Sequence, residues 1–163
     1  MSTLSLQLST QAIMNEIYAL SALHSLQNPT DGSCPLLTRD RQAALRLVVK
    51  DAFAFIVLKI IPHLAGCNLN EETGTGSADT SSNADFILSL LLNMPDSFPG
   101  NATGSLRHAL EHAIAMQSLH LCYLNYNDTL SRRHENLANE TIAQVISIIT
   151  STHNDIPHIL PHY

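Results

Sequence analysis

The sequence is short of charged side chains. Lys, Arg, Asp and Glu together make up 13% of its 163 residues, against about 25% in an ordinary globular chain. Acidic residues outnumber basic ones, and the formal net charge is −6. Because proteins bind nucleic-acid backbones with clustered Lys and Arg, this balance predicts no nucleic-acid partner. Apolar residues reach 45%, so we expect part of the surface to be hidden in a homo-oligomer or against other assembly proteins.

Segments that would direct the chain to a membrane are also lacking. The opening stretch MSTLSLQLSTQ has neither a basic n-region nor a long apolar h-region, which predicts no secretory signal. The most apolar run, 52–61, is too short to span a bilayer. The cysteines, Cys34, Cys67 and Cys122, have no C-x-x-C spacing, which favours free thiols in a reducing compartment. We therefore expect a cytoplasmic protein with no membrane partner, or a virion protein if a prophage encodes it.

The spacing of apolar residues predicts an all-α protein, a helical bundle that forms one domain over residues 1–163. Apolar residues recur with helical periodicity through most of the chain, and segments rich in Pro and Gly separate these runs. A tight link joins the last two runs. About five helices are expected, at 10–27, 38–62, 84–94, 105–125 and 128–151.

Three segments outside these helices have patterns of their own. Leucines alternate with polar residues in 1–9, which predicts an extended N-terminal arm. Residues 66–83 are rich in Gly, Ser and Thr and are expected to form a long flexible loop. Pro157 prevents the tail 153–163 from continuing the last helix, so the tail is expected to be an extended C-terminal arm.

The second expected helix is apolar nearly all round from Ala52 onward. A helix without a polar face is either central in its domain or shared with another subunit. We expect the outward side of 54–61 to supply a surface for a neighbouring subunit. On a helical wheel one side carries Val49, Ala52, Ile56 and Ile60, and the opposite side carries Ala54, Val57, Leu58 and Ile61.

The segment HALEH places His108, Glu111 and His112 in the H-x-x-E-H pattern of one class of zinc protease. Two histidines four residues apart on a helix can share a metal, and the glutamate could act as a base. A third protein ligand is required, but Glu135 and Glu140 lie at the margin of the next helix's apolar stripe or off it. We therefore interpret the motif as exposed helix residues and assign no catalytic, cofactor-binding or metal-ligating residue.

Two further histidines fall on apolar helix faces. His120 lies seven residues before Asn127 and His134 seven residues after it, and Asn127 belongs to the link that turns the chain back. At 1.5 Å rise per residue both rings should lie about 10 Å from the turn and approach one another. His24 has a similar position on the first helix. Bundle metal sites usually add inward carboxylates, and none is evident here, so neutral, hydrogen-bonded histidines are expected.

Three segments give the chain a resemblance to a known group of proteins. LTRDRQAALRLVVKDA opens a long helix, and SLRHALEHAIAMQSLHLCYLNYND with HENLANETIAQVISII forms a closing helical pair. In this order of helices and turns, residues 37–150 resemble small all-helical proteins of bacterial prophages and related mobile elements. The resemblance implies a virion structural component, such as a head–tail connector, and it brings no catalytic residues with it.

These patterns together predict a non-enzymatic structural or assembly protein that works by self-association and by contact with other virion or assembly proteins. One alternative is a zinc-dependent hydrolase that uses His108, Glu111 and His112. Another is a ligand-binding regulatory helical bundle with an apolar pocket. None of the motifs implies a cofactor.

Overall fold

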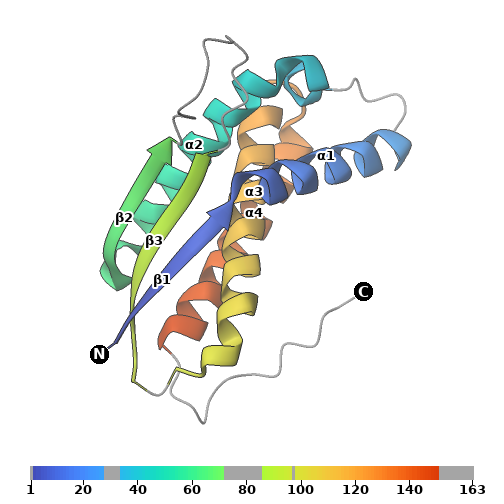
Figure 1. Ribbon diagram of the computed structural model, residues 1–163. Coiled ribbons are helices and arrows are strands. Elements are labelled where there is room, and N and C mark those ends of the chain that lie inside the picture. Colours follow the sequence, from blue (N-terminus) through green and yellow to red (C-terminus); the bar gives the residue numbers. More distant parts are fainter. Residues whose placement is uncertain (1, 28–33, 72–85, 97, 151–163) are drawn as a thin grey trace, which may run out of the picture.

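The fold combines helices with a small sheet, so the predicted all-α bundle of about five helices is wrong (Figure 1). The computed structural model describes residues 2–27, 34–71, 86–96 and 98–150. Short 3-10 turns lie at Pro35–Leu37, Arg39–Arg41, Ile61–His63 and Gly100–Ala102. The longer elements in the described ranges are β1 (Ser2–Ser9), α1 (Thr10–Gln27), α2 (Gln42–Ile60), β2 (Leu64–Glu71), β3 (Phe86–Met94), α3 (Thr103–Tyr123) and α4 (Asp128–Thr150).

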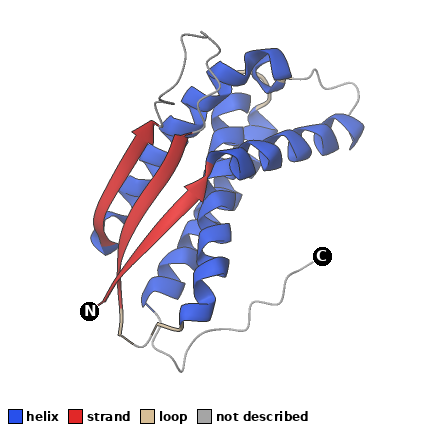
Figure 2. Cartoon of the chain, in the orientation of Figure 1, coloured by secondary structure: helices blue, strands red, loops and turns tan. Residues whose placement is uncertain are grey.

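The strands form one antiparallel sheet in the order β1-β3-β2, and Figure 2 shows this sheet as a layer against the helices. β1 pairs with β3 along its whole length, from Ser2 opposite Met94 to Ser9 opposite Ile87. Because successive side chains of a strand point to opposite faces, one face of the sheet carries most of the leucines. The buried residues of that face are Leu6, Leu8, Leu88, Leu90, Leu92 and Met94.

Residues 84–94, predicted to be a helix, instead form β3 from Phe86 onward. A short apolar run does not distinguish a strand from a buried helix by periodicity alone. Here Leu91 obscures the alternation, because it is apolar but lies on the outer face and is 36% exposed. Its neighbours Leu90 and Leu92 are buried, which is the alternation of a strand with one face on the core.

The segment 1–9 is extended, as predicted, but from Ser2 onward it is a strand of the chain's own sheet and not a free arm. Leu6 and Leu8 are each 1% exposed and belong to the core. The predicted loop is also wrong in part, because residues 66–71 belong to β2. β2 is an edge strand whose backbone pairs with β3, so it forms despite its low apolar content. The rest of that loop and the predicted tail 153–163 lie outside the described residues.

The central helix of the fold is α3. It packs against α1, α2, α4 and β1, and every residue from Ala113 to Leu119 is buried. After α3 the chain turns back into α4, and the backbone amides of Tyr126 and Asn127 both donate to the carbonyl of Tyr123 in that turn. The predicted tight hairpin of the last two helices is therefore confirmed (Figure 1).

Candidate functional site

The H-x-x-E-H motif lies on α3, where two of its side chains contact the start of α1. The Glu111 carboxylate accepts a hydrogen bond from the backbone N–H of Ser9, with an N–O distance of 2.9 Å. Nδ1 of His112 is bonded to the Glu16 carboxylate. The ring of His108 lies 6.5 Å from that of His112, measured between centroids. The glutamate and the second histidine therefore join α3 to the β1–α1 junction.

A metal site at this motif would need a third ligand, and the two glutamates considered for it are exposed on α4, at Glu135 and Glu140. Within the described ranges, no three or more His, Cys, Asp or Glu side chains gather in an arrangement that could hold a metal ion. The partner of His112 that sequence reasoning missed is Glu16, which lies 96 residues away. No local spacing could have indicated that contact.

A second group of histidines lies where α1 crosses the α3–α4 hairpin. The Nε2 atoms of His24 and His134 are 3.1 Å apart, so one ring donates an N–H to the other. The two ring centroids are 5.1 Å apart. Tyr123 stacks on His134 at 5.9 Å with an interplanar angle of 11°. We call His24, Tyr123 and His134 the histidine cluster; Tyr123 was not predicted as a member.

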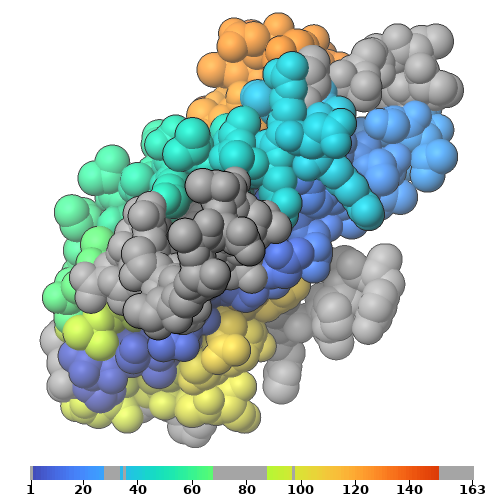
Figure 3. Space-filling model, turned by 45° about the horizontal axis from the view of Figure 1, so that its top comes forward, coloured from blue at the N-terminus to red at the C-terminus, as the bar shows by residue number. Residues whose placement is uncertain are grey.

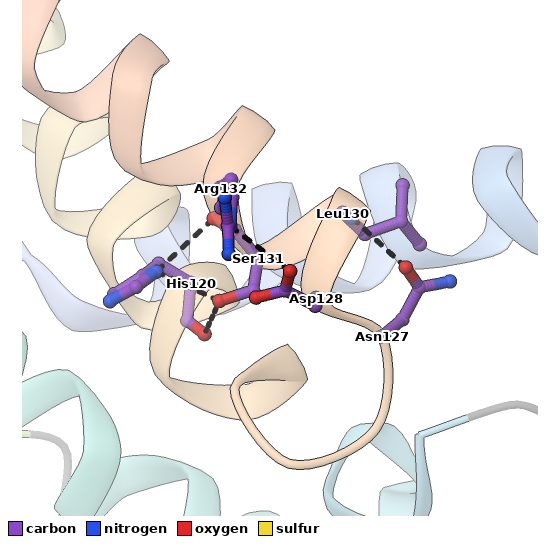
Figure 4. Close-up of polar contacts among 6 residues, drawn as sticks. All are labelled: His120, Asn127, Asp128, Leu130, Ser131 and Arg132. Carbon is purple, nitrogen blue, oxygen red and sulfur yellow. Dashed lines mark hydrogen bonds and ion pairs between the residues drawn. The ribbon is translucent and has the colours of Figure 1, made fainter.

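His120 does not belong to this cluster, so the expected close pairing of His120 with His134 is wrong. Its Nδ1 lies 3.0 Å from Oγ and 3.1 Å from the carbonyl oxygen of Ser131 (Figure 4). The turn occupies 124–127, so its midpoint precedes Asn127. The prediction counted seven residues on each side of Asn127 and so matched His120 with His134. The residue that contacts His120 is Ser131, about one helical turn earlier in α4.

Asn127 instead fixes the start of α4. Its side-chain oxygen accepts a hydrogen bond from the backbone N–H of Leu130 at 3.0 Å (Figure 4). Arg132 pairs with Asp128 one turn away, at 3.0 Å. An asparagine before the first turn satisfies an amide that has no partner within the helix, so the hairpin has a defined turn and a defined register.

Burial governs the protonation of the histidine cluster. It lowers the pKa of His134 to about 4, because the charged imidazolium loses its solvation, and nearby groups that can carry positive charge add to the shift: His24, Arg133, His120 and His112. Burial, followed by the charge of Arg133, also lowers the pKa of His24. His24 and His134 thus form a neutral, hydrogen-bonded pair, whereas the predicted pair was His120 with His134.

Two thiols lie close to the cluster and are held protonated. Burial raises the pKa of Cys122 to about 12, and the neighbouring Cys34 adds to the shift. The pKa of Cys34 is also raised by burial, and its Sγ–H donates to the carbonyl of Cys122 at 3.2 Å. A nucleophilic cysteine requires a thiolate, so this pair acts as buried packing. All three cysteines are free.

Exposed apolar side chains gather on one side of α2 and of the 3-10 turn Ile61–His63 that follows it. Leu47, Leu58 and Ile61 are 62%, 66% and 58% exposed, and Ala54 between them is also exposed. At 100° per residue these four side chains fall within about 60° of one another around the helix axis. We call them the α2 strip. In Figure 3, α2 lies at the surface in cyan to green.

The other side of α2 packs into the core as predicted. Val49, Ala52, Ile56 and Ile60 are fully buried. From the sequence, a helix without a polar face was expected to be either central in its domain or shared with another subunit. The central position belongs to α3, so the apolar outer side of α2 is not explained by packing within the described fold.

Of two exposed charged residues of α2, Asp51 lies beside the α2 strip, about 20° around the helix from Leu58, and Lys59 lies about 100° from Leu58. Asp51 and Lys59 are both exposed. The ammonium group of Lys59 lies 4.8 Å from the centre of the Phe55 ring and also contacts the side-chain oxygen of Asn139 on α4. These contacts direct the lysine side chain toward α4 and away from the strip.

A ligand-binding bundle would need an enclosed apolar pocket. The described residues of α4 line a surface groove of about 530 Å³ whose side chains are mostly polar or charged, which is a different kind of site. Its lining residues are Asp128, Thr129, Arg132, Arg133, Asn136, Leu137 and Glu140.

No family model matches this sequence, and no curated protein or solved structure is detectably similar to the chain. None of the helices in the described ranges combines the length and apolar content needed to cross a membrane.

Proposed function

We propose that this chain is a non-enzymatic structural or assembly protein that acts by self-association through the α2 strip. The observation that carries the proposal is the exposure of Leu47, Leu58 and Ile61 on one side of a helix whose other side is already buried. Fully burying one such side chain stabilises by about 1.5–3 kcal/mol. Contact between copies would therefore gain free energy that the isolated chain leaves unused.

The contacts of the H-x-x-E-H motif favour this proposal over a zinc-dependent hydrolase. The Glu111 carboxylate accepts the Ser9 amide, and His112 is bonded to Glu16. To act as a catalytic base or as a metal ligand, these two side chains would first have to break those contacts.

The virion part of the proposal rests on the resemblance of residues 37–150 to small prophage proteins. In that setting the protein would be a structural component of head–tail connector type, made in the cytoplasm and carried in the virion. Neighbouring genes for capsid or tail proteins would support this assignment, and a metabolic operon would contradict it.

The decisive experiment is a measurement of mass in solution by light scattering. The wild-type protein is expected to be a dimer or larger, and Leu58→Glu is expected to be monomeric because each strip would then carry a charge at its apolar centre. Leu58 is 66% exposed, so the substitution should leave the monomer folded, which circular dichroism can check.

Leu26→Glu provides the matched control, because Leu26 is 79% exposed but lies on α1. It should keep the mass of the wild type. A wild-type protein that is monomeric at high concentration would overturn the proposal. Equal loss of association in both variants would place the interface elsewhere.

A further inference from the structure

We infer that the end of α1, residues 21–27, is released by acid: protonation of the His24–His134 pair separates it from the α3–α4 hairpin while the rest of the fold stays packed. These residues make about two turns of helix, and we call them the α1 end. The inference is independent of the proposed self-association.

Few contacts attach the α1 end to the fold. The buried residues of α1 all precede it: Thr10, Ile13, Met14 and Ile17. Within the α1 end, Ser21 and His24 are half-buried and the other residues are exposed. The side chains of Ser21 and Tyr123 are hydrogen-bonded. The ring of His24 meets those of Tyr123 and His134 at centroid distances of 6.3 and 5.1 Å. Detachment of the α1 end therefore uncovers little apolar surface, as is typical of segments that open locally.

The histidine pair has no favourable place for an added proton. Its Nε2 atoms are 3.1 Å apart, so only one of them can carry a hydrogen. In the neutral pair His134 can donate from Nε2 and leave its Nδ1 without a hydrogen. A protonated pair has three hydrogens on four nitrogens, so both Nδ1 atoms become N–H groups. Nδ1 of His134 is buried and has no hydrogen-bond partner among the described residues, and protonation would leave a buried N–H there without an acceptor.

The surroundings of the pair supply no negative charge to an imidazolium. Burial lowers the pKa of both rings, that of His134 to about 4. Among the described residues, the groups that act on the two rings or on the phenol beside them are cationic when protonated, or are neutral thiols and a neutral phenol. They are Arg133 on α4, His112, His120, Cys122 and Tyr123 on α3, and Cys34. None of them is a carboxylate, so an imidazolium gains most by reaching water.

Release of the α1 end gives it that access, because Nε2 of His134 faces His24. The beginning of α1 responds to acid in the opposite way. Its Glu16 carboxylate is bonded to His112 of α3, and protonation gives this histidine a charge opposite to that of its partner. Acid therefore weakens the attachment of the end of the helix and not that of its beginning.

Native-state hydrogen exchange of the full-length protein tests the inference, at pH 7.5 and pH 5 and at urea concentrations below the unfolding transition. Two turns of helix are not stable without tertiary contacts, so the amides of a detached α1 end exchange with solvent. The pKa of His134 is 6.5 when the ring is exposed and about 4 in the fold. The equilibrium constant for opening should thus rise about 30-fold from pH 7.5 to pH 5.

After correction for the pH dependence of chemical exchange, the protection of residues 21–27 is expected to fall about 30-fold. Urea should have little effect on this exchange, since a local opening exposes little surface. Residues 113–119 of α3 should be better protected at both pH values and should depend steeply on urea, because they exchange through global unfolding.

The double variant His24→Phe/His134→Phe keeps two rings in contact and removes both titrating groups. Protection of its α1 end should be the same at the two pH values. His108→Gln, at an exposed position of α3, is the control and should behave as the wild type. The comparison of the two segments in the wild type is decisive even if the double variant does not fold.

Three results would each overturn the inference. Equal protection and equal urea dependence of 21–27 and 113–119 would show that the α1 end opens only when the whole chain unfolds. Local opening with the same protection at both pH values would show that the histidines do not control it. A wild-type pH response in the double variant would show that other groups do.

Discussion

Acid should destabilise the fold through His134, and the loss can be calculated from its environment. The ring is 2% exposed, and burial lowers its pKa from 6.5 to about 4. In the unfolded chain the same residue titrates at its ordinary pKa, so below pH 6.5 the unfolded state binds more protons. Stability from this residue is therefore complete above pH 6.5 and is lost as the pH falls toward 4.

The size of the effect follows from the two protonation equilibria. At pH 5 about 97% of unfolded chains carry the proton on residue 134, against about 9% of folded chains. The free energy of unfolding should thus fall by about 2 kcal/mol between pH 7.5 and pH 5 through this residue. His24 adds to the loss in the same direction, because its pKa is also lowered.

Urea denaturation at several pH values measures this loss. His134→Phe removes the titrating ring and keeps an aromatic side chain against Tyr123, so its stability should decline less between pH 7.5 and pH 5 than that of the wild type. His134→Gln serves as a second variant, and His108→Gln, at an exposed position of α3, is the control. Parallel pH profiles for the wild type and both His134 variants would refute the reasoning.

Two further predictions concern single side chains on α3. Glu111→Ala should lower the free energy of unfolding by about 1 kcal/mol, because the Ser9 amide loses its acceptor. Glu140→Ala, at an exposed position of α4, should change it little, and an equal effect of the two would contradict the structural role. Gln117→Met should raise the free energy of unfolding by about 1 kcal/mol, because the buried side-chain oxygen of Gln117 has no hydrogen-bond partner among the described residues. Thermal melts with Gln144→Met as the exposed control would measure it, and a lower stability than wild type would count against it.

The helices could be predicted because their periodicity is local. Residues 10–27 were predicted as a helix, and α1 has these bounds. The second helix was expected at 38–62, and α2 stops at Ile60 and continues as the 3-10 turn Ile61–His63. In each case the side chains that decide the element are neighbours in the sequence, so a single chain contains the required information.

The sheet could not be predicted in the same way. Whether 86–94 is a strand depends on β1 and β2, which supply its backbone partners from distant parts of the chain. Leu91 added an apolar residue on the outer face and removed the alternation that would have indicated a strand. The polar character of 66–71 was consistent with a loop because an edge strand needs few apolar side chains.

A contact between histidines of different helices was predicted, but the residue that pairs with His134 was not. His134 was expected to meet another histidine, and its partner is His24, not His120. The prediction took Asn127 as the centre of the turn. Moving that centre by one or two residues changes which residue of α4 faces His120 by about a helical turn. Arrangements of α1 relative to the hairpin had no sequence signal at all.

Two apolar stretches of helix need different explanations. In α3 every residue from Ala113 to Leu119 is buried between neighbouring elements, so a polar face would have no solvent to meet there. α2 has neighbours on one side, and the fold of a single chain gains little from Leu47, Leu58 or Ile61, which are more than half exposed. Substituting a polar residue at such an exposed position usually changes the free energy of unfolding by less than about 0.5 kcal/mol. Apolar side chains there stabilise the protein chiefly when something covers them, as the proposed self-association would.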